Sequence, residues 1–260
     1  MSIRIGVCGD ISSIAVAEKA GYAYMECAFS RIATMSEEEF KTALHYLDDV
    51  NIKVESCNGY FTSDVVLIGD KVDFKFIEEY SRRGMERVSK LGCKVIVIGS
   101  GTARRIPEGV PFEEGFNQFA KVVGFCADIA KEYGITIVVE PLNTRETNLI
   151  NTVADGIELC EKVNRENVKG LVDFYHWFMN GETLDDIVNA KGKLAHVHLA
   201  RDNEDRRSPK AENLETCKVW AATLKKIGYN GRISLECGFD YDNYEADITA
   251  ARKIVTVFED

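Results

Sequence analysis

The stretches KVIVIG (residues 94–99) and ITIVVE (residues 135–140) decide the fold class, because apolar residues occupy both faces of each run. Strands of this kind belong to a parallel sheet that is covered on both sides. Between the two runs, Phe116, Phe119 and Val123 follow the three- and four-residue spacing of an amphipathic helix. The region therefore predicts a strand–helix–strand unit with parallel strands.

The same alternation continues in both directions along the chain. Short β-rich runs occur at residues 3–7, 22–27, 52–57, 94–98, 135–140, 168–173, 194–198 and 232–236. Helical patterns separate them, and no linker or composition break interrupts the series. We expect one (βα)8 TIM barrel over residues 1–260. The alternative is an open, doubly wound sheet, which is disfavoured because no Gly-rich nucleotide-binding turn follows the first strand.

Helix signals support this assignment. Ser36 with Glu39, and Thr152 with Asp155, each place a capping side chain three residues before an acidic residue. Glycines fall between a helical pattern and the next strand, where a left-handed residue ends a helix. They are Gly21, Gly92, Gly134 and Gly228.

Composition excludes several classes of protein. Of 260 residues, 45% are hydrophobic and 28% are charged, which is typical of a folded domain. The formal charge of −10 disfavours nucleic acid and anionic membranes as partners, which leaves small-molecule partners and a homo-oligomer open. Eight cysteines without a C-x-x-C pair predict reduced thiols and a cytoplasmic protein. Neither a targeting segment nor a membrane span is expected.

Four consecutive strands end in residues that bind metals, and barrel chemistry is located at strand ends. They are Glu140, Asp173, His198 and Glu236. Three carboxylates meeting at one barrel mouth repel one another unless a cation neutralises them. The sequence therefore predicts one divalent ion, with Mn²⁺ favoured over Co²⁺, Mg²⁺ or Zn²⁺, because oxygen ligands with a single imidazole differ from a closed structural Zn²⁺ site.

Five segments carry a family resemblance. In chain order they are EPLNTRETNLINT (140–152), VDFYH (172–176), HVHLA (196–200), RRSP (206–209) and ISLE (233–236). They resemble the xylose isomerase-like barrels of the D-tagatose 3-epimerase and D-psicose 3-epimerase type. The first half of the chain resembles that family mainly in its barrel rhythm. The chain departs from those epimerases at two places where they carry aromatic residues. It has Cys8 and Gly9 at the end of the first strand, and Gly238 two residues beyond Glu236.

The resemblance implies the roles of individual residues. Glu140 and Glu236 would be catalytic and would also bind the metal, together with Asp173 and His198. Glu146, His176 and Arg206 would contact the substrate, and Arg207 is nearly as good a match as Arg206. The implied reaction is epimerisation of a ketose or ketose phosphate at C3 through a metal-stabilised cis-enediolate, with the two glutamates exchanging protons on opposite faces.

Other functions remain open. An aldose–ketose or hydroxypyruvate-type isomerase would use the same metal with one base, and an inosose dehydratase-like lyase would expel water. Three further functions are disfavoured. A repair endonuclease needs more histidines and a basic face, and a Schiff-base aldolase needs a lysine at a strand end, which this sequence lacks. A noncatalytic sugar-binding barrel would be expected to lose one glutamate, yet both are present. The turn at residues 99–101, with Arg104 and Arg105, is a weak phosphate-binding motif.

Two neighbouring residues receive expectations of their own. We expect His196 on the opposite side of its strand from His198, packed in the core or against helices, and do not include it in the site. Glu26, at the end of the second strand, either supports the metal ligands or caps the barrel rim.

Overall fold

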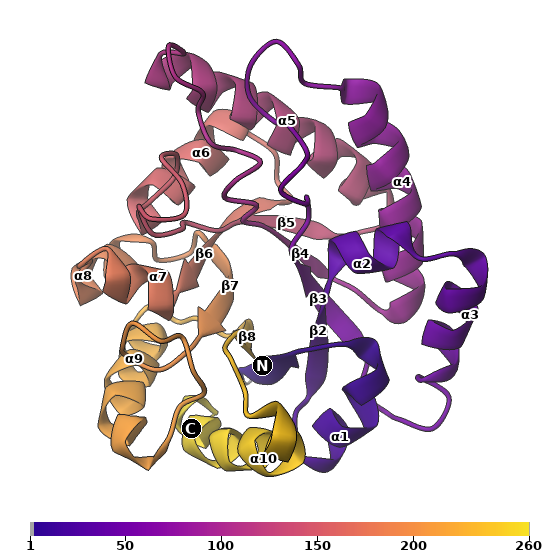
Figure 1. Ribbon diagram of the computed structural model, residues 1–260. Coiled ribbons are helices and arrows are strands. Elements are labelled where there is room, and N and C mark those ends of the chain that lie inside the picture. The colour runs from indigo at the N-terminus through magenta and orange to yellow at the C-terminus, as the bar shows by residue number, and fades with distance from the viewer. Residues whose placement is uncertain (1–2, 260) are drawn as a thin grey trace.

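The computed structural model describes residues 3–259 and is a closed barrel of eight parallel strands in sequence order (Figure 1). The strands are β1 (Arg4–Cys8), β2 (Tyr24–Ala28), β3 (Val54–Asn58), β4 (Val95–Ile98), β5 (Thr136–Val139), β6 (Val168–Asp173), β7 (Leu194–Leu199) and β8 (Arg232–Leu235). β8 pairs with β1 from Arg4↔Arg232 to Val7↔Leu235, which closes the barrel. The predicted (βα)8 TIM barrel is confirmed, and the open sheet is excluded.

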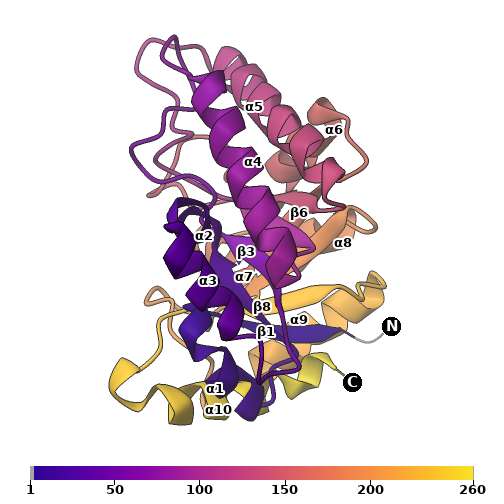
Figure 2. The same cartoon turned by 90° about the vertical axis from the view of Figure 1, so that its right-hand side faces the viewer.

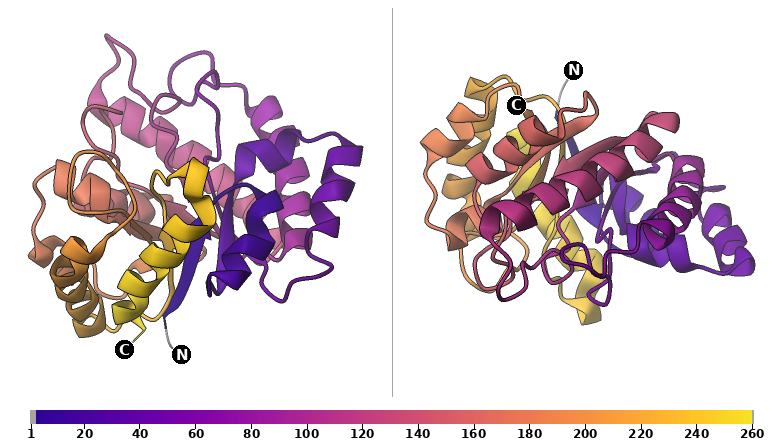
Figure 3. Two further views of the ribbon diagram at one scale, coloured as in Figure 1. Left: turned by 60° about the horizontal axis from the view of Figure 1, so that its bottom comes forward. Right: turned by 90° about the horizontal axis from the view of Figure 1, so that it is seen from above.

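Helices surround the strands on the outside (Figures 1 and 3). They are α1 (Ile14–Lys19), α2 (Phe29–Thr34), α3 (Glu37–His45), α4 (Phe74–Leu91), α5 (Phe112–Glu132), α6 (Val153–Val163), α7 (Phe174–Met179), α8 (Leu184–Asn189), α9 (Leu214–Lys226) and α10 (Tyr244–Ile254), with 3₁₀ turns η1 (Ile11–Ser13), η2 (Ala211–Asn213), η3 (Tyr241–Asn243) and η4 (Val255–Phe258). α4 and α5 are the longest and pack side by side (Figure 2).

The predicted helix ends are confirmed. Ser36 and Glu39 form a capping box at α3, in which the Glu39 carboxylate accepts the Ser36 N–H at 2.7 Å. Thr152 and Asp155 do the same at α6. Gly92 follows α4 with φ of 103°, a left-handed conformation that glycine adopts without steric cost.

Two hydrophobic cores lie between the outer face of the barrel and the surrounding helices. One lies between β2–β5 and their helices, and the other covers β1 and β6–β8. A third, small cluster of Val95, Val97, Val138 and Leu171 lies inside the barrel, because Val138 and Leu171 precede Glu140 and Asp173 by two residues and share their inward face. The interior is therefore packed, as in other TIM barrels.

Tyr24, on β2, fills the part of the barrel interior across from this small cluster. Its ring is fully buried, and its hydroxyl lies 2.8 Å from Ser234 Oγ. A Cβ on Gly6 would overlap this ring, so a glycine is required at that position of β1. The aromatic ring thus occupies the space that a side chain on residue 6 would take.

All eight cysteines are unpaired thiols, five of them buried, as the sequence predicts. Within residues 3–259, no helix has both the length and the apolar character needed to cross a bilayer.

Candidate active site

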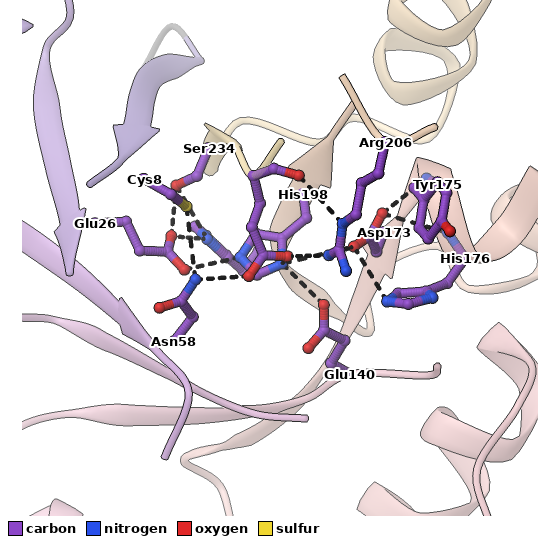
Figure 4. A network of polar contacts seen from close by, with 12 residues as sticks. Cys8, Glu26, Asn58, Glu140, Asp173, Tyr175, His176, His198, Arg206 and Ser234 are labelled. Carbon is purple, nitrogen blue, oxygen red and sulfur yellow. Dashed lines mark hydrogen bonds and ion pairs between the residues drawn. The ribbon is translucent and has the colours of Figure 1, made fainter. Parts of the chain in front are cut away.

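The carboxyl ends of the strands meet at one mouth of the barrel. The residues that face inward at or just after these ends are, in chain order, Cys8, Glu26, Asn58, Gly99, Glu140, Asp173, His198 and Glu236. In Figure 4, Cys8, Glu26 and Asn58 lie on one side of His198, whereas Asp173 and Arg206 lie on the other. His198 is at the centre of the group.

His198 brings the predicted ligand residues together. Its Nδ1 lies 3.0 Å from Glu140 Oε1, 3.0 Å from Glu236 Oε2 and 4.0 Å from Asp173 Oδ2. One ligand atom from each of the four residues lies within 4.8 Å of the others. His198, Asp173 and Glu140 are buried, so three carboxylates and one imidazole converge in a space largely closed to water.

The start of α7 orients the Asp173 carboxylate. Asp173 is the N-cap, and its Oδ1 accepts the backbone N–H of Tyr175 at 2.7 Å and, more weakly, that of His176 at 3.4 Å. This leaves Oδ2 free to face the cluster. A helix that begins directly after β6 therefore both caps itself and aims a carboxylate oxygen into the site.

Arg206 is the arginine that reaches the cluster. Its guanidinium forms ion pairs with Asp173 Oδ2 at 2.8 Å and with Glu236, and lies over the Tyr175 ring. The Arg206 backbone has φ of 49°, and its carbonyl accepts the Gly238 N–H at 2.7 Å, which ties this loop to the segment after β8. Arg207 is exposed, and its guanidinium lies 3.5 Å from the Phe239 carbonyl. The geometry favours Arg206 of the two candidates.

His176 presents an N–H to the same space. The Asn143 backbone N–H, at 3.1 Å, and the Asn143 side-chain amide, at 2.9 Å, both donate to His176 Nδ1. In the neutral ring the proton is therefore on Nε2, which is buried, has no hydrogen-bond partner and lies 3.7 Å from Asp173 Oδ2. Glu146, whose side chain is 43% exposed, accepts from the Asn143 amide and lies at the rim.

Charges in the cluster shift one another's pKa values. Burial raises the pKa of Glu140, and the nearby Glu236 carboxylate raises it further. Burial acts on Glu236 in the same direction, but His198 and Arg206 hold its pKa well below the usual range. Burial opposes a charge on His198, yet Glu236 and Glu26 together hold its pKa well above the ordinary value. The carboxylates thus require nearby positive charge.

Glu26 and His196 lie directly beneath His198, and here one expectation was wrong. His196 faces the barrel interior, where its Nε2 lies 2.8 Å from Glu26 Oε2. Residues two apart on a strand share a face, so the H-x-H of β7 places both rings inside. Glu26 does not cap the rim: it is fully buried, and its Oε1 lies 2.8 Å from Nε2 of His198, one of the candidate ligands.

Sequence reasoning missed Asn58 and Gly99. The Asn58 amide donates to Glu236 Oε1 at 2.6 Å, and a Cβ on Gly99 would overlap Glu140 Oε2. Both residues lie at the carboxyl ends of strands, like the candidate metal ligands. However, an amide and a glycine are not residue types that indicate a catalytic or metal site in a sequence. The phosphate motif loses support, since Arg104 is fully buried against Ile150 and Phe119, while Arg105 donates to the Glu146 carbonyl.

Comparisons with known proteins agree with this architecture. A family model described as a xylose isomerase-like TIM barrel matches residues 14–254. An L-ribulose 3-epimerase from Methylomonas sp. (strain DH-1) is 29% identical over 235 residues, covering 88% of this chain and 78% of the relative. A 2-oxo-tetronate isomerase from Haemophilus influenzae is 32% identical over 157 residues, 58% of each chain. The solved structure of a D-psicose 3-epimerase with D-tagatose, from Clostridium cellulolyticum H10, has a TM-score of 0.84 at 19% identity, covering 99% of this chain and 100% of the other.

Proposed function

The chain belongs to the xylose isomerase-like TIM barrel family, and from that premise we propose that it is a divalent-metal-dependent isomerase that inverts C3 of a ketose or ketose phosphate. The observation that carries the proposal is the convergence of Glu140, Asp173 and Glu236 on His198 Nδ1. The relatives named above include a sugar 3-epimerase and a sugar-acid isomerase, which supports this reaction class.

The donor set fits a divalent ion. Three carboxylates and one imidazole lie close enough to share a single cation, and this mixture suits Mn²⁺, Co²⁺ or Mg²⁺. Arg206 places positive charge between Asp173 and Glu236, and grouped carboxylates are stabilised by such a counter-charge. Glu140, Asp173, His198 and Glu236 would hold the ion. Bound there, it would supply Lewis-acid polarisation of the substrate carbonyl and the adjacent hydroxyl.

Glu140 and Glu236 are the proton-transfer groups in this proposal. One glutamate, as the carboxylate, takes the proton from C3, and the electron pair moves into an enediolate. The other glutamate, in its protonated form, delivers its proton to the opposite face of C3. Glu140 directly follows β5 and Glu236 directly follows β8, so the two residues approach the site from different sides of the barrel. Asn58 fixes Glu236 through a hydrogen bond to Oε1, while Gly99 leaves room for Glu140 Oε2.

His176 and Arg206 orient the substrate. The unpartnered Nε2–H of His176 is a buried donor that a substrate oxygen can satisfy, which favours binding in one orientation. Arg206 lies between the cluster and the Tyr175 ring and supplies further donors at the mouth. Glu146 can accept a hydroxyl at the rim.

The proposal is tested by proton exchange. D-Psicose, D-tagatose, L-ribulose and phosphorylated ketoses are incubated with the Mn²⁺-loaded protein in D₂O and followed by NMR. Deuterium at C3 together with the 3-epimer is the expected result. Deuterium only at C1 or C2 would identify an aldose–ketose isomerase, and loss of water a lyase. Absence of exchange and of product in every sugar would contradict the proposal.

Replacing His176 with alanine should affect the substrate and not the metal. The variant loses a buried imidazole N–H that faces the mouth without a partner among the described residues. We therefore expect kcat/KM to fall about 10-fold to 100-fold, the cost of leaving one buried substrate oxygen without its hydrogen bond. Metal content, measured by atomic absorption, should equal that of the wild type. Loss of metal from His176→Ala would contradict the assignment.

Gly99→Ala tests the space beside Glu140. The added methyl group would overlap Glu140 Oε2, and the carboxylate must move to make room. Misplacement of a reacting group by about 1 Å costs roughly 100-fold in rate, so activity should fall by that order while the barrel stays folded. Gly124→Ala in α5 is the matched control, because its new Cβ meets only Val163 at 3.5 Å. Equal activity in both variants would show that Glu140 is not constrained there.

A further inference from the structure

The carboxylate of Glu26 accepts hydrogen bonds from both histidines of β7 and from two serine hydroxyls. Oε1 accepts the Nε2–H of His198 at 2.8 Å. Oε2 accepts the Nε2–H of His196 at 2.8 Å, the hydroxyl of Ser56 at 2.6 Å and that of Ser234 at 2.5 Å. All five side chains are completely buried. This arrangement is a closed hydrogen-bond network directly under the candidate metal ligands.

The network explains this buried group without a second cation. Glu26, His196 and His198 are residue types that bind metals, and their ligand atoms lie within 4.8 Å of one another. However, the Nε2 atom of each histidine faces a Glu26 oxygen at ordinary hydrogen-bond distance, and two serine hydroxyls donate to the same carboxylate. The arrangement is that of a carboxylate that accepts four hydrogen bonds.

The contact with His198 decides which ring nitrogen faces the cluster. A neutral imidazole has one N–H and one lone pair, so a proton held on Nε2 leaves the lone pair on Nδ1. Nδ1 is the nitrogen that lies 3.0 Å from both Glu140 and Glu236. Ring orientation and tautomer are therefore set from below by Glu26.

We propose that Glu26 is a positioning residue that holds the Nε2–H of His198, so that Nδ1 presents its lone pair to a divalent ion shared with Glu140, Asp173 and Glu236. This inference rests on the metal site of the proposed function. His196 contributes by engaging the other carboxylate oxygen, which prevents Glu26 from rotating away. Partners of this kind typically contribute 10-fold to 100-fold to metal affinity.

Glu26→Gln is the variant that tests the role. The amide has one oxygen and one NH₂ group, and three donors meet at the position of Oε2. The amide oxygen therefore stays with them and the NH₂ group faces His198. The ring must then accept at Nε2 and carry its proton on Nδ1, which blocks the metal-facing nitrogen.

Titration calorimetry with Mn²⁺ should show that Glu26→Gln binds at least 10-fold more weakly than the wild type. The matched control is Glu55→Gln on β3, whose carboxylate pairs with Arg4 and Arg232 at the other end of the barrel and should leave Mn²⁺ affinity unchanged. Circular dichroism verifies that each variant is folded. A folded Glu26→Gln with wild-type Mn²⁺ affinity would overturn the inference.

Nitrogen-15 NMR gives a readout that a merely structural role would not change. The chain has only four histidines, so the variants His45→Gln, His176→Gln and His196→Gln assign three of the rings and leave the His198 signals by elimination. With one equivalent of Zn²⁺, the wild type should show the His198 Nε2–H as a slowly exchanging proton, and Glu26→Gln should lack it. Its persistence in Glu26→Gln would contradict the proposed hydrogen bond.

The two proposals fail in different ways. If the wild type binds Mn²⁺ and Glu26→Gln binds it equally well, the positioning role is wrong while the metal site stands. If neither binds Mn²⁺, the proposed function is wrong and the positioning role falls with it.

Discussion

Glu140→Gln and Glu236→Gln are each expected to lower C3 epimerisation by about 10²-fold to 10⁴-fold while Mn²⁺ remains bound, the range attributed to a lost acid–base group. Glutamine keeps an oxygen for the metal but does not accept a proton from carbon. Inversion requires proton transfer on two faces, so loss of either carboxylate stops the full reaction. Turnover is followed by chromatography of the two epimers, and metal content by atomic absorption.

The two variants differ in what they retain. A carboxylate left intact on one face can still exchange the C3 proton with D₂O without inversion, and the variant that does so identifies the base for that face. Glu55→Gln serves as the control, since Glu55 pairs with arginines away from the mouth. Full epimerase activity in either metal-loaded variant would overturn the two-base mechanism and favour a one-base isomerase.

Removal of the divalent ion is expected to abolish turnover, with recovery on addition of Mn²⁺ or Co²⁺. The same ion should stabilise the fold, because it binds four residues that come together only in the native barrel. At free Mn²⁺ about 100 times Kd, the gain is about 2.7 kcal/mol. For a chain of this size that gain raises Tm by roughly 5–10 °C.

His198→Ala is the matched variant for this effect. It removes the one nitrogen that all three carboxylates approach, so Mn²⁺ should no longer raise its Tm. Differential scanning calorimetry with and without Mn²⁺ measures both proteins. Undiminished turnover of a metal-stripped wild type would contradict metal dependence, and an equal Mn²⁺-induced rise in His198→Ala would contradict the assigned ligand.

The sequence predicts the barrel well because its signals are local. Alternating β-rich runs and helical spacing place all eight strands within two residues of their observed bounds. The Ser36 and Thr152 capping boxes need only residues three apart. Short helices such as α2 and α7, which begin directly after β2 and β6, are less visible because they are only six residues long.

The candidate site is predicted less completely because its contacts are long-range. Strand ends indicate which carboxylates meet, but Arg206 and Arg207 are distinguished only by the backbone turn that aims Arg206 at Asp173 and Glu236. Asn58 and Gly99 carry no chemical signature, and their importance comes from what β8 and β5 place beside them. The sequence does not decide between two roles for Glu26, because its bond to His198 spans 172 positions of sequence.

The Tyr24 ring, which occupies the space beside Gly6, fills the barrel interior below the candidate active site. With the apolar cluster of Val95, Val97, Val138 and Leu171, it blocks passage through the barrel axis. Molecules can therefore enter and leave the candidate site only through the mouth of the barrel. For the proposed reversible inversion of one carbon, each epimer would therefore compete with the other for the same entrance, and the site would admit one molecule at a time.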